Sequence, residues 1–446
     1  MTSFAVCADV GSTYTKVAVV DLAGGELVAT ATHRTTSDSD VLHGLDAAVA
    51  QATAKLGARR LPWYVCSSAG GGLRLAVVGY ERLVTAQAGH RVGLSAGARV
   101  VHVAAGRLDG AALAALRAAR PDVVLLVGGT DGGDAEVLTH NAHRLARARW
   151  RVPVVLAGNA DVRDELREVL AGRGVPVTVA DNVLPRIGVL RPTSARAAIR
   201  EVFLRHVIGG KRLSRGRRFA DLVRAATPDA VLTGVELLAD HTSGDLVVVD
   251  VGGATTDVYS VLTPDEREGG PAQEVAGVLW RSRTVEGDLG MRWSAPGVVR
   301  AAAAERLLAE GEEESLATRA AARAANPAFV AVDPLERAVD LRIASLAATV
   351  ALRRHARSES PGGRAARDLR DVSLLIGSGG VLRHAEPDEA LSVLRTVLAD
   401  HAGGWPLPRA AAPVVDVDYV LAAAGLLAAD HPGAALALLR RHLLRA

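Results

Sequence analysis

One short pattern occurs twice in this 446-residue chain and constrains the fold more than any other feature. The segment ADVGSTYTKVAVVD, residues 8–21, aligns without gaps with VDVGGATTDVYSVL, residues 249–262. The alignment pairs Asp9 with Asp250, Gly11 with Gly252, Thr15 with Thr256 and Val17 with Val258. Recurrence of one pattern at so wide a separation predicts that two halves of the molecule share one structural plan.

Each copy reads as a β-strand that ends in Asp-x-Gly and reverses through small residues. Such a turn exposes backbone N–H groups and hydroxyls, which suits a phosphate group, and glycine allows close backbone approach. The residues we expect to bind phosphate are Gly11, Ser12, Thr13 and Thr15 in the first turn and Gly252, Gly253, Thr255 and Thr256 in the second. Lys16 would supply positive charge, and the second copy has Asp257 in its place. We expect Asp9 and Asp250 to hold hydrated Mg²⁺ between two turns that grip a triphosphate from both sides.

A third glycine-rich turn follows the apolar run VSLLI and consists of Gly377, Ser378, Gly379 and Gly380. Ordinary β-hairpins are the alternative interpretation of the first two turns, because Gly, Ser, Thr and Asp are common turn residues. The gapless repeat together with the third turn favours a nucleotide site over that alternative. The pattern GxxxxGK[ST] is absent from the sequence, which excludes a P-loop protein.

The order of apolar runs predicts an α/β protein with an insertion. The opening runs FAVCADVG, KVAVVDL and ELVATATHRT are typical of an antiparallel meander. Between residues 61 and 191 apolar runs alternate with amphipathic stretches, which predicts a βαβ subdomain with a parallel sheet. A helix is expected to begin at Thr227 and Pro228, with Thr227 as its N-cap. The predicted division is 1–60 for the first lobe, 61–191 for the insertion, 192–244 for the rest of the first lobe and 245–446 for the second lobe.

Composition excludes several classes of protein. The 52 Lys and Arg residues are interspersed among 49 Asp and Glu residues, and aromatic residues make up 3% of the chain, so nucleic acid is not an expected partner. No apolar run approaches the length of about 18 residues that spans a membrane, and we expect a cytoplasmic protein. Cys7 and Cys66 stand in apolar segments without the spacing of a metal site, and both are expected to be small core residues.

These motifs as a set resemble the actin, heat-shock-chaperone and sugar-kinase superfamily of ATPases. DVGSTYTK looks like the first phosphate motif of that superfamily, DVGGATTD like the second and LLIGSGGV like its adenosine motif. PDAVLTGVELLAD and DYVLAAAGLLA look like its two connecting helices, where Gly234 and Gly425 would permit close packing. The resemblance implies a two-lobed fold of duplicated ribonuclease-H-like lobes, with ATP and Mg²⁺ as cofactors.

One position departs from that pattern. The chaperones have a Glu that positions the attacking water where this chain has Thr227. Water activation would then fall to Asp250 or Asp9, or hydrolysis would be slow.

A closer resemblance covers nearly the whole chain. Segments such as CSSAGGGLRLAVVG, VVLAGNADV, DNVLPRIGVL and EGDLGMRWSA, together with the motifs above, resemble the GlmL or MutL family of accessory proteins of glutamate mutase, which is unrelated to mismatch-repair MutL. The resemblance implies an ATP-dependent reactivating chaperone of an adenosylcobalamin-dependent mutase, which would exchange damaged cobalamin for intact cofactor. Asp9, Asp250 and Lys16, the charged residues of the two repeated turns, are the catalytic residues that we expect.

Two rival functions stay open. A small-molecule kinase of the same fold would need a carboxylate base, for which Asp288 is the candidate. A nucleotide-gated binding protein without useful turnover would fit the threonine at position 227. The segment GGTDGGDAE, Gly128 to Glu136, reads either as an anion-binding turn at a strand end or as a plain strand-to-helix turn.

Overall fold

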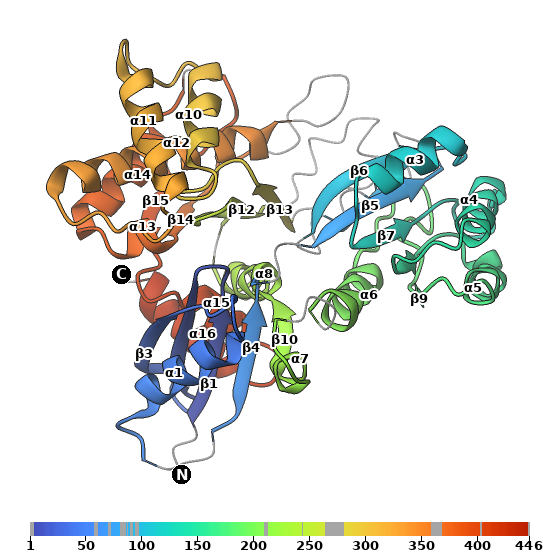
Figure 1. Ribbon diagram of the computed structural model, residues 1–446, viewed down its shortest axis with the longest axis horizontal. Helices are drawn as coiled ribbons and strands as arrows, with labels where there is room; N and C mark the ends of the chain where they lie inside the picture. The colour runs from blue at the N-terminus through green and yellow to red at the C-terminus, as the bar shows by residue number, and fades with distance from the viewer. Residues whose placement is uncertain are drawn as a thin grey trace.

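Three separate five-stranded sheets make up the frame of the molecule (Figure 1). The computed structural model describes residues 4–57, 61–69, 73–80, 86, 88–89, 92–93, 98–208, 213–242, 244–263, 281–357, 368–401 and 404–444. Two of the sheets form two lobes, and the third forms a domain to one side of them. Among the helices that lie within these ranges, none combines the length and apolar character needed to cross a bilayer.

The first lobe is built on the predicted meander. Its strands are β1 (Phe4–Val10), β2 (Tyr14–Asp21), β3 (Glu26–Arg34), β4 (Trp63–Ser67) and β10 (Val223–Ala226), in the order β10-β4-β1-β2-β3. β1, β2 and β3 pair antiparallel, whereas β4 lies parallel to both β1 and β10. The helix α1 (Val41–Thr53) begins with Asp40 as its N-cap and packs its apolar face on β2 and β3.

The second lobe repeats this topology. Its strands are β11 (Leu246–Val251), β12 (Thr256–Val261), β13 (Arg281–Glu286), β14 (Leu374–Ser378) and β15 (Ala412–Val415), in the order β13-β12-β11-β14-β15. The first three strands are again antiparallel, and β14 is parallel to β11 and β15. The helices of this lobe are α10 (Ala295–Ala304), α11 (Glu312–Ala325), α12 (Pro334–Ala356), α13 (Gly380–Arg383) and α14 (Pro387–Leu398). The predicted duplicated, two-lobed fold is therefore confirmed.

The inserted domain has an all-parallel sheet. Its strands are β5 (Arg74–Gly79), β6 (Arg99–Ala105), β7 (Val123–Leu126), β8 (Val154–Leu156) and β9 (Val177–Val179), in the order β6-β5-β7-β8-β9. Around it lie α3 (Gly110–Ala118), α4 (Glu136–Arg147), the 3₁₀ turn η1 (Ala160–Val162), α5 (Arg163–Ala171) and α6 (Thr193–Val202). The chain returns to the first lobe through the π-helix η2 (Phe203–Ile208) and α7 (Arg218–Leu222).

The predicted start of the insertion at Leu61 was wrong. The strand β4 pairs with β1 over five residues and so belongs to the sheet of the first lobe. The separate sheet begins only at Arg74, with β5. Both strands are short apolar runs, and the sequence alone does not tell which sheet each one joins.

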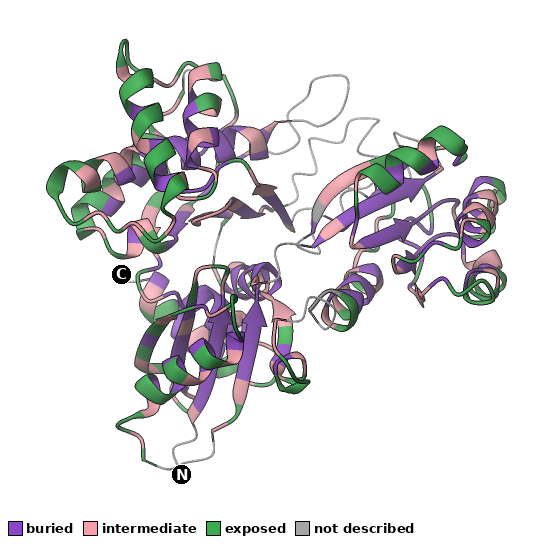
Figure 2. Ribbon diagram, in the orientation of Figure 1, coloured by how far each residue is buried: buried purple, intermediate pink, exposed green. Residues whose placement is uncertain are grey.

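Two crossing helices join the lobes, namely α8 (Thr227–Ala239) and α15 (Val420–Leu427). A Cβ added at Gly234 would lie 2.2 Å from the carbonyl oxygen of Leu421, and one at Gly425 would lie 1.8 Å from that of Ala230. The helices therefore touch backbone to backbone, as predicted. Their apolar faces form one core with residues of both lobes, continued by α16 (Pro432–Leu443) (Figure 2).

Candidate functional site

The repeated segments form two turns of the same geometry. The N–H of Gly11 donates to the carbonyl oxygen of Tyr14 at 3.1 Å, and the N–H of Gly252 donates to that of Thr255 at 2.9 Å. A Cβ at Gly11 or Gly252 would lie 2.7 or 2.9 Å from the same carbonyl oxygens. Each turn therefore requires glycine at this position, and the sequence repeat is also a structural repeat.

The two turns face each other across the space between the lobes. A Cβ placed on Gly253 would lie 3.7 Å from the hydroxyl oxygen of Thr13. A larger side chain at Gly253 would fill the gap between the turns, and glycine keeps it open. The hydroxyl of Thr13 and the backbone of Gly253 therefore lie face to face, and hydroxyls and backbone N–H groups are the donors that suit a phosphate group.

The predicted hydroxyl donors fall into two groups. Ser12 is exposed, and Thr13 and Thr255 are half-buried at the turn surfaces. The other two are fully buried beneath the turns. Thr15 shares a hydrogen bond of 3.0 Å with the Thr35 hydroxyl, and Thr256 donates to the carbonyl oxygen of Leu289 at 2.6 Å. In this structure these two hydroxyls anchor the turns rather than line their surfaces.

Asp9 ends β1 in a buried cluster of polar groups. The ammonium group of Lys16 lies 3.6 Å from its carboxylate, and the thiol of Cys66 lies 3.7 Å from it. The hydroxyl of Thr227 also donates to this carboxylate. Lys16 lies in addition over the ring of Tyr419, 3.5 Å from its centroid. The structure thus brings together two predicted catalytic residues, Asp9 and Lys16, and adds Thr227 and Tyr419, to which sequence analysis assigned no contact here.

The prediction that Thr227 is an N-cap was wrong. The N-cap of α8 is Ala226, and Thr227 is the first helical residue. The hydroxyl of Thr227 donates to the Asp9 carboxylate. The residue that replaces the expected glutamate therefore lies at the site, where it holds a carboxylate rather than supplying one.

Asp250 occupies the equivalent place at the end of β11. Burial raises the pKa of its carboxyl group to about 6, with smaller upward contributions from Asp257, Asp9 and Asp416, while Lys16 lowers it. Such a group is ionised at neutral pH yet able to accept a proton. Asp257, the counterpart of Lys16, is held by the buried guanidinium of Arg283 at 2.8 Å.

The same two aspartates are the candidates for a metal. No group of three or more His, Cys, Asp or Glu side chains arranged to hold a metal ion occurs in the described part of the chain. Mg²⁺ commonly binds through one or two carboxylates, keeps several waters and takes its other ligands from substrate phosphates. Asp9 contributes to the raised pKa of the Asp250 carboxyl group, so the two carboxylates lie near each other and are the predicted pair for such a site.

The third glycine-rich turn lies beside the second one. Gly377 and Ser378 end β14 opposite Val249 and Asp250 of β11. Gly379 has a φ of 109°, and a Cβ there would lie 2.2 Å from the carbonyl oxygen of Val251, so only glycine fits. Gly380 has no atom within 4 Å of its Cβ position. Three of the predicted motifs therefore meet at one end of the two lobes.

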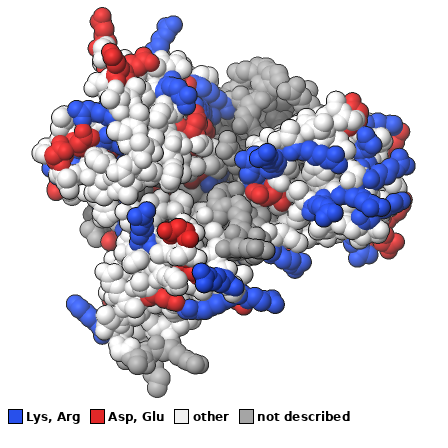
Figure 3. Space-filling model, in the orientation of Figure 1, with Lys and Arg blue, Asp and Glu red and all other residues white. Residues whose placement is uncertain are grey.

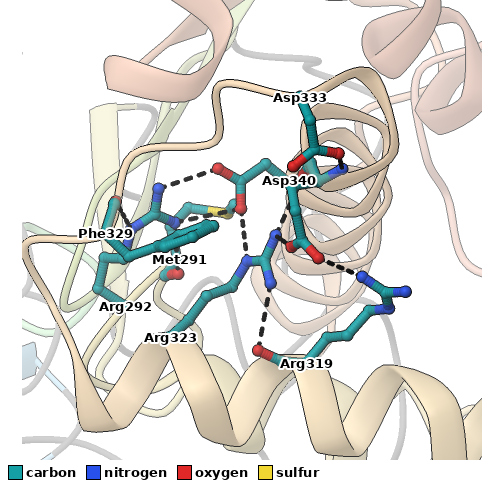
Figure 4. A network of polar contacts seen from close by, with 8 residues as sticks. Met291, Arg292, Arg319, Arg323, Phe329, Asp333 and Asp340 are labelled. Atoms are coloured by element: carbon teal, nitrogen blue, oxygen red, sulfur yellow. Dashed lines mark hydrogen bonds and ion pairs between the residues drawn. The ribbon is translucent and has the colours of Figure 1, made fainter.

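A segment distant in sequence holds the second turn in place. The N–H of Met291 donates to the carbonyl oxygen of Gly252 at 2.9 Å, and that of Arg292 donates to Gly253 at 2.8 Å. Figure 4 shows how the Arg292 guanidinium continues into a buried network with Asp340 and Arg323. Arg292 pairs with Asp340 at 2.9 Å, and Arg323 pairs with the same carboxylate at 2.6 Å. Sequence analysis missed this network because its residues come from different elements.

Asp288 and the Gly128–Glu136 turn were the two further candidates for site residues. Asp288 forms a two-pronged ion pair with Arg354 of α12, at 2.7 and 3.0 Å. It is therefore engaged as an ion-pair partner rather than free to act as a base. In the Gly128–Glu136 turn, the backbone N–H groups of Asp131, Gly132 and Gly133 bond to acceptors within the protein. This favours the plain strand-to-helix turn over an anion site.

Two lobes of one topology, each placing a glycine-rich turn opposite the other, define the actin-like ATPase fold. Within that fold class the chain belongs to the MutL family, because the family model described as "MutL protein" matches residues 5–443. It is similar to "Protein MutL" of Clostridium tetanomorphum, with 35% identity over 411 residues that cover 88% of this chain and 89% of that protein.

Solved structures of low sequence identity are also similar to the chain. A diol dehydratase-reactivating factor in nucleotide-free form shares 12% identity, with 99% of each chain covered and a TM-score of 0.36. Component A of the (R)-2-hydroxyglutaryl-CoA dehydratase of Acidaminococcus fermentans shares 10% identity, covering 98% of this chain and 99% of that chain with a TM-score of 0.31.

Proposed function

We propose that this protein is an ATP-dependent reactivating factor of an adenosylcobalamin-dependent mutase, namely glutamate mutase. It would act in the cytoplasm and exchange damaged cobalamin on the inactivated enzyme for adenosylcobalamin. The proposal that the protein uses ATP rests on the pair of matched glycine turns, with Gly253 of one turn facing Thr13 of the other. Membership of the MutL family and the resemblance of the motifs to accessory proteins of glutamate mutase support the choice of partner.

Different residues of the chain would bind the phosphates, the metal and the adenosine of the nucleotide. Backbone N–H groups and the hydroxyls of Ser12, Thr13 and Thr255 would bind phosphate oxygens, and Lys16 would supply positive charge. The carboxylates of Asp9 and Asp250 would hold Mg²⁺ through water. Bound Mg·ATP would supply the phosphoryl group and the cation that neutralises its developing charge. The Gly377–Gly380 turn would receive the adenosine.

Asp250 would orient the attacking water. Its pKa of about 6 leaves it ionised at neutral pH and close enough to neutrality to accept a proton. Asp9 is held by Lys16 and by the hydroxyl of Thr227, so its carboxylate is fixed as an acceptor. Thr227 therefore positions Asp9, and the absence of a glutamate at 227 favours slow hydrolysis.

The inserted domain would transmit the nucleotide state to the partner. Its sheet packs on α6, and α6 is joined to the connecting helix α8 by two ion pairs. Arg196 pairs with Glu236 at 3.2 Å, and Arg200 pairs with the buried Asp229 at 2.8 Å. Asp229 lies two residues from Thr227, which donates to Asp9. A shift of α8 on hydrolysis would therefore reach the insertion directly, and a variant without the insertion that still binds the mutase would refute this role.

The test is recovery of an inactivated mutase. Glutamate mutase inactivated with cyanocobalamin is incubated with the protein, Mg·ATP and adenosylcobalamin, and mutase activity and phosphate release are followed for wild type and Asp250→Ala. We expect recovery only with ATP and intact Asp250. ATP binding without recovery would refute the reactivating role.

The two rival functions give different results in the same assay. A kinase would consume ATP only with a small-molecule acceptor, and the ion pair of Asp288 with Arg354 speaks against it. A nucleotide-gated binding protein would bind ATP without turnover, and Thr227 is the observation that favours it.

A further inference from the structure

A basic pocket lies on the inserted domain, away from the nucleotide turns. It is a cavity of about 380 Å³ at the amino ends of β7 and β8, lined by Arg117, Arg120, Arg149, Trp150 and Arg151 among others. The arginines come from the end of α3 and from the loop that follows α4. Figure 3 shows many Lys and Arg side chains over the inserted domain, at the right of the view, with Asp and Glu side chains among them.

The positive charge of the pocket is not neutralised within the protein. None of the four arginines forms an ion pair with a carboxylate of the described residues, and all four are exposed. The C-termini of α3 and α4 are close by and carry about −0.5 of an elementary charge each, which accounts for some cationic side chains here. Four guanidinium groups outweigh two such ends several-fold, so a strong preference for anions remains.

The backbone holds the arginines in place. Arg120 and Arg149 have φ values of 46° and 47°, in the left-handed region that glycine usually occupies after a helix. The guanidinium of Arg74 donates to the carbonyl oxygens of Ala119 and Arg120 at 2.7 and 3.0 Å, which fixes the first of these turns. Both arginines therefore stand at the position that ends a helix in the left-handed conformation.

Trp150 forms the floor of the pocket. It is 4% exposed, and its indole N–H has no hydrogen-bond partner among the described residues. The guanidinium of Arg117 lies 5.9 Å from the centroid of its ring. A buried ring that is covered in this way cannot stack on a base, and stacking is a principal device by which proteins bind single-stranded nucleic acid.

We propose that this pocket is the docking site for an acidic segment of a protein partner. Guanidinium groups bind carboxylates through paired hydrogen bonds, and a cavity of this size accepts one or two Asp or Glu side chains. The site lies at the opposite strand ends from the Gly128–Glu136 turn and involves no residue of the nucleotide site. The proposal stands whether or not the protein reactivates a mutase.

The experiment uses the full chain and a fluorescein-labelled hexaglutamate peptide, with binding followed by anisotropy in low salt. Arg120→Glu and Arg151→Glu are the pocket variants, and Arg173→Glu is the matched control, an exposed arginine of the same domain outside the pocket. We expect each pocket variant to weaken binding about tenfold, the effect of losing one charge-assisted contact. The control should stay within about twofold of wild type.

Several outcomes would overturn the proposal. They are no binding of hexaglutamate by the wild type, an equal loss in Arg173→Glu, tighter binding of single-stranded DNA than of the peptide, or complete displacement of the peptide by inorganic phosphate at low millimolar concentration. Phosphate release from ATP serves as the check of folding, because none of these substitutions touches the nucleotide turns. If the wild type shows no ATP turnover, thermal melting of each variant replaces phosphate release as the check of folding. Failure of the ATPase proposal is then separate from failure of the docking proposal.

Discussion

Substituting Gly425 by alanine should separate the two lobes at their tightest contact. The added Cβ would lie 1.8 Å from the carbonyl oxygen of Ala230 and 2.9 Å from the backbone nitrogen of Gly234. Both neighbours are helix backbone, so no side chain can move aside, and α8 and α15 would have to part by roughly 1 Å or more. The apolar core shared by the lobes would loosen along the whole crossing. We expect a loss of about 3 kcal/mol in the free energy of unfolding, the upper end for an overpacked site.

The assay is thermal unfolding of Gly425→Ala beside Gly433→Ala. A Cβ at Gly433, in α16, meets no atom within 4 Å, so this matched substitution adds a methyl group in open space. Alanine there should be neutral or stabilise by up to about 1 kcal/mol. We expect the Tm of Gly425→Ala to fall by about 3 °C, because an unfolding entropy of about 2.1 cal/mol/K per residue converts that loss for a chain of this length. Equal melting of the two variants would refute the backbone contact between the helices.

Three further substitutions test other parts of the site. Because burial raises the pKa of Asp250 to about 6, the folded chain binds this proton more readily than the unfolded chain, and stability falls as pH rises from about 4 to 6. Asp250→Asn should therefore raise the free energy of unfolding at pH 7.5 by about 1–3 kcal/mol and flatten its pH profile in chemical denaturation; an unchanged profile would contradict this. Thr227→Val removes a donor to the Asp9 carboxylate and should cost about 1.5–3 kcal/mol by thermal melting, whereas Thr227→Ser should not; equal losses would argue against the hydrogen bond. Asp340→Ala removes the one carboxylate that joins Arg292 to the buried Arg323, which keeps Glu336 as its other partner, and should cost about 3 kcal/mol in urea denaturation, against less than about 0.5 kcal/mol for the exposed Glu313→Ala; similar values would exclude the network.

The features that sequence analysis predicted well are local. A strand, an Asp-x-Gly turn and a second strand are set by neighbouring residues, and the pairing of Asp9 with Lys16 across β1 and β2 follows from the turn. Because the pattern repeats, the same pairing is predicted for Asp250 and Asp257 across β11 and β12. Duplication therefore allowed one local pattern to predict two sheets.

The burial of Thr15 is predictable from the alternation of side chains along its strand. Side chains alternate between the two faces of a strand, so Thr15 lies on the same face as the buried Val17, while Tyr14 faces outward. The same reasoning places Thr256 beside Val258. Strand alternation alone would have assigned both threonines to the core side of the turn.

No local sequence pattern predicts the contacts around Asp9 and Lys16. Thr227 is 218 residues away in the sequence, and Tyr419 reaches Lys16 from the second connecting helix region. Pairings of this kind depend on how the lobes meet, which no local pattern encodes. The start of the insertion was misplaced for a related reason, because strand partners are set by tertiary packing rather than by the apolar run itself.

The most direct test of the central claim is calorimetric titration with Mg·ATP of wild type, Gly11→Ala and Gly252→Ala. The methyl group of Gly11→Ala would lie 2.7 Å from the carbonyl oxygen of Tyr14, and that of Gly252→Ala would lie 2.9 Å from the equivalent oxygen of Thr255. If both turns grip one triphosphate, wild type binds a single nucleotide and each variant loses at least about tenfold in affinity while Gly433→Ala does not. Wild-type affinity in either turn variant, with its fold intact, would contradict a clamp made by both lobes.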